Sequence, residues 1–137
     1  VKHMDWIAGS RQHIFEIFIS RALVLVPIYI LGFSKEVIDA YVIIVGFQAV
    51  FNHANVQINF GFLKYIFVTP QFHHWHHSSD EAGLDKNYAL HFSFLDYLFG
   101  SAVSSDQEWP DGYGVVGDYV PDGLINQQLF PFKWDGK

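Results

Sequence analysis

"TPQFHHWHHSSD", residues 69–80, places four of the chain's eight histidines within five positions. The two residues at its start, Thr69 and Pro70, are typical of a helix N-terminus. A threonine hydroxyl accepts a free backbone N–H there, and proline fits the first helical position. The stretch therefore predicts a helix from Pro70, and this helix decides how the histidines are arranged.

The spacing of these histidines predicts a metal site. On a helix, His73, His76 and His77 lie at i, i+3 and i+4 and project from one face, whereas His74 points elsewhere. Three neutral imidazole nitrogens within a few ångströms can hold one metal ion or bridge into a pair of metals. The alternative is a run of surface histidines or an opportunistic zinc site. Without a metal, however, such crowded imidazoles would be desolvated or would repel one another below about pH 6.5.

Three further candidates lie outside the cluster in two short motifs. In "FNHANVQ", residues 51–57, we predict His53 as an additional ligand at a helix end, the alternative being a buried histidine bonded to a backbone carbonyl. Asn55 is either a helix-end residue or a donor that supports the site. In "LDKNY", Asp85 and Asn87 either form a plain turn or hydrogen-bond the far nitrogen of a ligand imidazole. No residue is assigned as a catalytic acid or base.

Length and composition narrow the class of protein. The 137 residues suit a single domain, and because the chain opens on Val1 we expect it to be the C-terminal part of a larger one. The absence of cysteine excludes disulfides and thiolate metal sites. A net charge of -6 without a basic cluster argues against nucleic acid as a partner.

The apolar stretches predict an all-α fold built on a membrane helical hairpin. Only 16% of the residues are charged, below the usual share of about 25%. Residues 14–33 and 37–51 are largely apolar, and "GFSKE" between them is typical of a helix-turn-helix break. Extended to about 20 residues, the second helix would be long enough to cross a bilayer. A buried hairpin of a soluble helical protein is the alternative, although a third apolar stretch at 56–68 favours the membrane.

The basic residues predict an orientation. The open side of the hairpin carries Lys2, Arg11, Lys64 and Lys86, so the positive-inside tendency places that side, with the histidines, in the cytoplasm. Cytoplasmic helices would carry the histidine cluster. Residues 101–137, rich in glycine, proline and aromatic residues, predict an irregular tail packed on the rest.

Several motifs together resemble one family. "NHAN", "YIFVTPQFHHWHHS", "DKNYA" and "FLDYLFG" resemble the fatty acid hydroxylase and sterol desaturase superfamily of integral membrane, non-haem di-iron oxygenases. The tail "EWPDGYGVVGDYVPDG" resembles the bacterial sterol desaturase-like branch, and "MDWIAGSRQH" resembles the stretch after an earlier histidine box. The resemblance covers essentially the whole chain. Ser101 replaces a threonine found in many members.

The resemblance implies an enzyme of lipid biosynthesis. It would use iron, two ions in the intact enzyme, and O2 as co-substrate to hydroxylate or desaturate a sterol or a fatty acyl chain. An electron donor similar to cytochrome b5, a ferredoxin or a reductase would be its partner, and the bacterial inner membrane its location. Only the later half of the family's histidine pattern is present here, so the ligands His53, His73, His76 and His77 would form an incomplete set. His13 and His91 are candidate extra ligands by the same resemblance.

Other functions stay open at this point. The chain could be a non-catalytic metal-binding membrane module, an inactive fragment of such an oxygenase, or a metal-dependent hydrolase acting on lipid. Iron content and oxygen consumption separate these readings, because only the oxygenase needs both.

Overall fold

The computed structural model describes residues 2–103, 109–117 and 121–133. Within these ranges the regular structure consists of α-helices and short 3-10 helices, and one isolated β-bridge pairs Ser78 with Tyr113. The predicted all-α class is therefore confirmed for the described residues. Parts of the predicted irregular tail, residues 104–108, 118–120 and 134–137, lie outside them.

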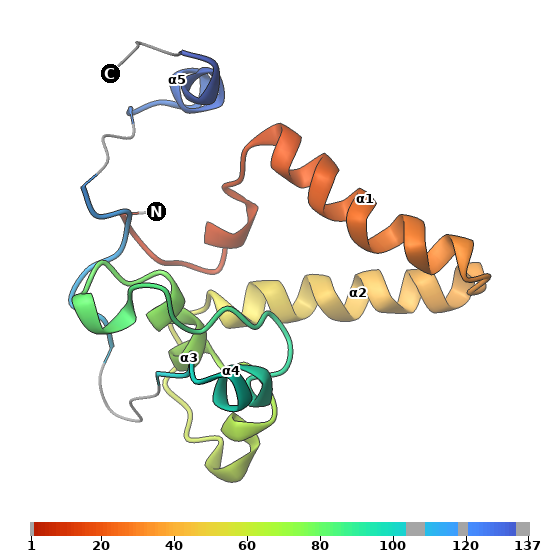
Figure 1. The fold of residues 1–137 in the computed structure, drawn as a ribbon, viewed down its shortest axis with the longest axis horizontal. Helices are drawn as coiled ribbons and strands as arrows, with labels where there is room; N and C mark the ends of the chain where they lie inside the picture. Colours follow the sequence, from red (N-terminus) through yellow and green to blue (C-terminus); the bar gives the residue numbers. More distant parts are fainter. Residues whose placement is uncertain (1, 104–108, 118–120, 134–137) are drawn as a thin grey trace. The chain divides into compact units, whose positions relative to one another are not determined.

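Two long helices follow the apolar stretches predicted to be helical (Figure 1). Helix α1 spans Ile14–Ile30 and begins after His13, whose Nδ1 accepts the backbone N–H of Phe15 at 3.2 Å. Helix α2 spans Lys35–Asn52. Between them the backbone turns at Gly32, where φ is +78°, a conformation that only glycine adopts without a Cβ penalty. The predicted helix-turn-helix break is thus present.

The length and charge of these helices correct one prediction. Among the described residues, no helix is both long enough and apolar enough to cross a lipid bilayer. Helix α1 has 17 residues and includes Glu16 and Arg21, and α2 carries Lys35, Glu36 and Asp39 in its first turns. The expected membrane-spanning hairpin is therefore not what the structure shows.

The chain divides into two compact units. One consists of residues 12–40 and 117–137 and includes helix α5, Leu124–Leu129, which composition alone did not predict. In this unit, Nε2 of His13 donates to the backbone carbonyl of Gln128 at 2.7 Å. The rings of Phe15 and Phe132 meet edge to face at 5.8 Å between centroids. The tail is therefore partly helical rather than wholly irregular.

The other unit, residues 1–11 and 41–116, contains the end of α2 and the two short helices α3, Pro70–His76, and α4, Phe94–Phe99. Its interior is unusually polar. Proline aside, the buried apolar side chains among the described residues are Met4, Ala8, Val68, Phe72 and Trp75. The buried polar ones are Asn52, His53, Thr69, His73, His74, Ser78, Asn87, Ser93 and Asp96. Buried polar groups are costly unless they are hydrogen-bonded or bind a ligand, so each needs a partner.

Asp96, in the motif "FLDYLFG", shows how such a partner set fixes the backbone. Its carboxylate accepts the backbone N–H groups of Tyr88 and Ala89, both at 2.9 Å, and the hydroxyl of Ser101 at 2.6 Å. Three charge-assisted hydrogen bonds to one buried carboxylate hold residues 88–101 as a closed loop around α4. That loop begins two residues after Lys86, whose backbone carbonyl lies 3.1 Å from Nδ1 of His76.

Candidate metal centre

Helix α3 begins as the sequence predicts. The hydroxyl of Thr69 accepts the backbone N–H of Phe72 at 3.3 Å, and Pro70 occupies the first turn. The helix ends at His76, and His77 is its C-terminal cap. One short helix therefore presents the H-x-x-H-H motif at its C-terminal end.

Three histidines bring one nitrogen each to a common point. Nε2 of His73 lies 3.2 Å from Nε2 of His53 and 3.1 Å from Nε2 of His77. The candidate ligand atoms of the three residues all lie within 4.8 Å of one another. His53 follows directly on α2, so the point is formed where the end of α2 meets α3.

These separations fit a shared metal ion. When two nitrogens bind the same ion at about 2.1 Å, and the angle between the two bonds is about 90–109°, the nitrogens are about 3.0–3.4 Å apart. Both Nε2 pairs of the cluster fall in this range. Without an ion, nitrogen lone pairs would face one another across these distances. Nε2 of His73 can carry one proton, so it could donate a hydrogen bond to His53 or to His77 but not to both. The donor set therefore matches a cation better than it matches hydrogen bonding.

Protonation favours the same interpretation. Burial, followed by repulsion from the neighbouring histidines, His77 first, lowers the pKa of the His73 imidazole from 6.5 to about 2. Burial, followed by repulsion from His76 and His53, lowers the pKa of His77 from 6.5 to about 3. Both rings are neutral at physiological pH, which is the form that binds a metal.

His53 is held in the orientation that a ligand needs. Its Nδ1 donates to the backbone carbonyl of Ala49 at 2.7 Å. The proton is thereby placed on Nδ1, and Nε2 is left with a lone pair directed at the other two histidines. The alternative predicted from the sequence, a buried histidine bonded to a backbone carbonyl, is present too. Nδ1 makes that bond, while Nε2 faces the other histidines.

His76 lies beside the cluster without joining the three nitrogens. Its ring centroid is 5.6 Å from that of His73 and 5.1 Å from that of His77. Nδ1 of His76 donates to the backbone carbonyl of Lys86 at 3.1 Å, so its Nε2 also has a free lone pair. The structure thus brings together three of the four predicted ligands and places the fourth next to them, and metal binding by all four stays a prediction.

The "LDKNY" loop supports His76 through its backbone rather than through the side chains proposed from sequence. Asp85 and Asn87 both have positive φ, 55° and 54°, on either side of Lys86. Asp85 is exposed and accepts the Tyr88 hydroxyl at 3.2 Å. The expected bond from either side chain to an imidazole is absent among the described contacts, because the Lys86 carbonyl fills that role.

Asn87 instead fastens α3 to the chain that follows α4. Its Nδ2 donates to the carbonyls of Phe72 at 2.8 Å and Val103 at 2.7 Å, and its Oδ1 accepts the N–H of Val103 at 2.7 Å. The side chain is fully buried. Asn55, the remaining supporting residue, donates to the Met4 carbonyl at 3.0 Å and so ties the N-terminal segment to the end of α2.

The two candidate extra ligands have other contacts. Nδ1 of His91 donates to the side-chain oxygen of Gln48 at 2.7 Å, and His91 is not among the residues whose nitrogens converge. His13 belongs to the other unit, where Nδ1 caps α1 and Nε2 donates to Gln128. A role for either in metal binding is not supported by these contacts.

Sequence reasoning missed one residue that contacts the site. A Cβ added to Gly9 would lie 2.9 Å from Cε1 and 3.0 Å from Nδ1 of His53, closer than real side chains approach. Gly9 therefore leaves the space in which the His53 ring lies. "MDWIAGSRQH" drew notice only through the family resemblance, and nothing in it signalled this contact.

Comparison with known proteins agrees with the site. The family model described as fatty acid hydroxylase matches residues 1–101. The chain belongs to this family. Its matched part includes every described residue of the histidine cluster, and the cluster is consistent with the di-iron site that the resemblance implies.

The chain is similar in sequence to the ornithine lipid hydroxylase OlsE of Rhizobium tropici. The two are 29% identical over 133 residues, which is 96% of this chain. The chain spans 40% of the length of that relative. No solved structure matches the chain significantly.

Proposed function

We propose that this chain provides part of the iron site of an O2-dependent lipid hydroxylase. The observation that carries the proposal is the convergence of Nε2 atoms from His53, His73 and His77 in a member of the fatty acid hydroxylase family. Membership of the fatty acid hydroxylase family and the similarity to the ornithine lipid hydroxylase of R. tropici favour hydroxylation over desaturation. We expect the upstream histidine boxes of the family pattern to complete the ligand set for two irons.

When bound, iron would supply the activation of O2 that oxygen insertion into an unactivated C–H bond requires and that side-chain acids and bases cannot provide. The chain's own residues hold the donors. The Ala49 carbonyl fixes the tautomer of His53, and the Lys86 carbonyl fixes that of His76. Burial of His73, 3% exposed, keeps water and protons away from its ring.

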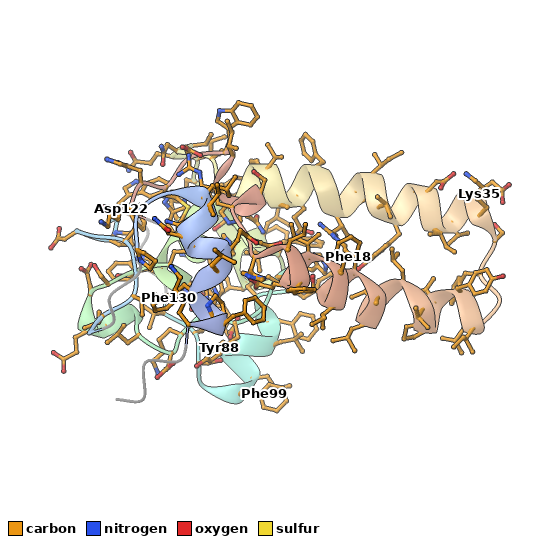
Figure 2. All side chains as sticks on the ribbon, turned by 90° about the horizontal axis from the view of Figure 1, so that it is seen from above. Phe18, Lys35, Tyr88, Phe99, Asp122 and Phe130 are labelled. Carbon is orange, nitrogen blue, oxygen red and sulfur yellow. The ribbon has the colours of Figure 1, made fainter. Side chains whose placement is uncertain are left out.

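The exposed apolar side chains of α1 support a lipid as substrate and surroundings. No residue of α1 is buried, and Figure 2 labels Phe18, which is 68% exposed. An apolar surface of this extent marks a site of membrane or protein interaction. We propose that lipid covers it, with the cluster facing the cytoplasm of a bacterium. The reaction also needs two electrons for each O2, so an electron-donor protein is a proposed partner.

The test is oxygen incorporation. This chain, joined to the upstream histidine boxes that complete the ligand set, would be loaded with iron, supplied with a reductant and isotopically labelled O2, and given an ornithine lipid or a phospholipid in vesicles. The proposal expects a product that carries one labelled oxygen atom, and its loss in His73→Ala. The matched control is His3→Ala, because His3 is exposed and distant in sequence from the ligands.

Other results would favour the other functions. A redox-silent metal at one equivalent, with no oxygen uptake, would favour a metal-binding module. Product formation without oxygen or reductant would favour a hydrolase. Either result would contradict the proposal.

A further inference from the structure

His74 lies in the middle of the histidine motif and has no place among the three converging nitrogens. Its side chain is fully buried, at 0% exposure. Its ring packs edge to face on Trp109, at 4.4 Å between centroids, and on Tyr113, at 5.5 Å. Nδ1 of His74 and the hydroxyl oxygen of Tyr113 are 2.8 Å apart. The polar partner of this buried imidazole therefore comes from a segment 39 residues away.

The segment that carries Tyr113 is fixed to the chain just after α3. Ser78 and Tyr113 form an antiparallel bridge. The N–H of Ser79 donates to the Gly112 carbonyl at 3.0 Å, and the N–H of Gly114 donates to the His77 carbonyl at 3.2 Å. These bonds leave the Tyr113 hydroxyl little freedom to move relative to His74.

A close approach adds to this constraint. A Cβ on Gly112 would lie 2.6 Å from the hydroxyl oxygen of Ser79. A side chain at position 112 would therefore push against the Ser79 side chain where the two segments pair. The N–H of Asp111 also donates to the carboxylate of Asp80 at 2.8 Å. Residues 111–114 thus form a clasp over the end of α3, and we call them the C-terminal clasp.

The hydrogen bond from the clasp decides the tautomer of His74. Nε2 of His74 is buried and lacks a partner with normal hydrogen-bond geometry among the described residues. The ring nevertheless interacts with the backbone at His53 and Ala54. If Tyr113 donates its hydroxyl proton to Nδ1, the imidazole proton lies on Nε2 and faces those backbone oxygens. In the other tautomer a nitrogen lone pair would face them, which is repulsive.

We propose that Tyr113 is a positioning residue for the metal centre, acting through His74. The hydroxyl fixes the ring between the clasp and the end of α2, and so sets the distance between His53, directly after α2, and His73, on α3. This inference rests on the proposed metal-binding function. It extends beyond the family match, because Tyr113 lies outside residues 1–101.

The experiment compares Tyr113→Phe with Tyr97→Phe in the full chain. Both variants remove one hydroxyl from a tyrosine whose ring packs on other aromatic groups, and the Tyr97 ring packs on Phe72 and Tyr65. Long-range proton–nitrogen NMR spectra of the metal-free protein report the tautomer of His74. Titration with Co²⁺ reports metal affinity and, from its absorption spectrum, the ligand geometry.

For Tyr113→Phe we expect a mixture of His74 tautomers, about a tenfold loss of Co²⁺ affinity and an altered Co²⁺ spectrum. Tyr97→Phe should keep the wild-type values. A purely structural role for the hydroxyl would lower the melting temperature but leave the tautomer and the spectrum unchanged, and this result would overturn the inference. If Tyr113→Phe does not fold, His74→Gln tests the same point: unchanged Co²⁺ affinity and spectrum would overturn it.

The outcome for wild type separates this inference from the proposed function. If wild type binds no Co²⁺ or Fe²⁺, both the metal centre and the positioning role are overturned. If wild type binds the metal and Tyr113→Phe binds it equally well with the same spectrum, only the positioning role is wrong.

Discussion

Nε2 of His53 and Nε2 of His73 lie 3.2 Å apart, although the two residues are 20 positions apart, His53 directly after α2 and His73 within α3. Each ring is buried, and the far nitrogen of His53 is occupied by a carbonyl. Two imidazoles in this arrangement need a proton or a cation between them. The predictions that follow treat that contact as one edge of a metal site.

Gly9→Ala should weaken metal binding without unfolding the chain. The new methyl group would lie 2.9 Å from the His53 ring, so the ring must shift away from His73. We expect a loss of about tenfold in metal affinity, the size seen when groups that orient a ligand are removed. Isothermal titration with Fe²⁺ under anaerobic conditions measures it.

Gly46→Ala is the matched control. Gly46 lies in α2 with nothing within 4 Å of an added Cβ. This change should leave metal affinity unchanged and stabilise the helix by about 0.5–1 kcal/mol. Equal affinities of the two variants would show that Gly9 does not position His53.

Acid should destabilise the metal-free chain over a defined range. The folded-state pKa values of His73 and His77, about 2 and about 3, lie below the ordinary value of 6.5 that applies when the chain is unfolded. The unfolded state therefore binds more protons below pH 6.5, and the free energy of unfolding falls as pH decreases from 6.5 toward 3. Urea unfolding of the metal-free protein at several pH values measures this slope.

Removing the two rings should reduce that slope. His73→Phe and His77→Phe keep an aromatic ring at each position but remove the imidazole that binds a proton. A slope between pH 6.5 and 3 that is unchanged in the double variant would show that other groups cause the acid sensitivity.

Asn87→Gly should destabilise the fold strongly. Glycine accepts the positive φ of this position, so the backbone is not strained, but the carbonyls of Phe72 and Val103 and the N–H of Val103 lose their buried partners. We expect the free energy of unfolding to fall by about 2–5 kcal/mol. Chemical denaturation followed by circular dichroism gives the value.

Asp85→Gly provides the comparison at nearly the same φ, 55° against 54°. Asp85 is exposed and its side chain accepts only a bond from the exposed Tyr88 hydroxyl among the described contacts. Its replacement should change stability by less than about 1 kcal/mol. Similar losses at both positions would mean that backbone conformation, not the Asn87 side chain, stabilises the loop.

The sequence predicted the parts of the site that depend on local structure. The Thr-Pro start fixed the phase of α3, and the i, i+4 pair His73 and His77 meets as expected. His76 at i+3 diverges, because positions i+4 and i+3 deviate from position i by about 40° and about 60° in opposite directions around a helix. Its nitrogen therefore bonds the Lys86 carbonyl instead of joining the other two.

Contacts between distant segments could not be predicted from the same pattern. Gly9 and Tyr113 approach His53 and His74 from parts of the chain that carry no periodic signal. The role of Asn87 could not be decided from the sequence, because its motif is equally typical of a turn and of a ligand support, and only its buried hydrogen bonds distinguish the two. The hairpin was predicted to lie in a bilayer on the assumption that its second helix extends to about 20 residues, whereas among the described residues no helix is both long enough and apolar enough to cross a bilayer.

The most direct measurement is X-ray absorption spectroscopy of the iron-loaded chain, compared between wild type and His53→Ala. The account predicts scattering from several imidazole rings, with nitrogens at roughly 2.0–2.2 Å from iron, and fewer rings in the variant. Wild-type and His53→Ala spectra that are identical, or an iron spectrum without imidazole scattering, would contradict the claim that His53, His73 and His77 bind one ion together.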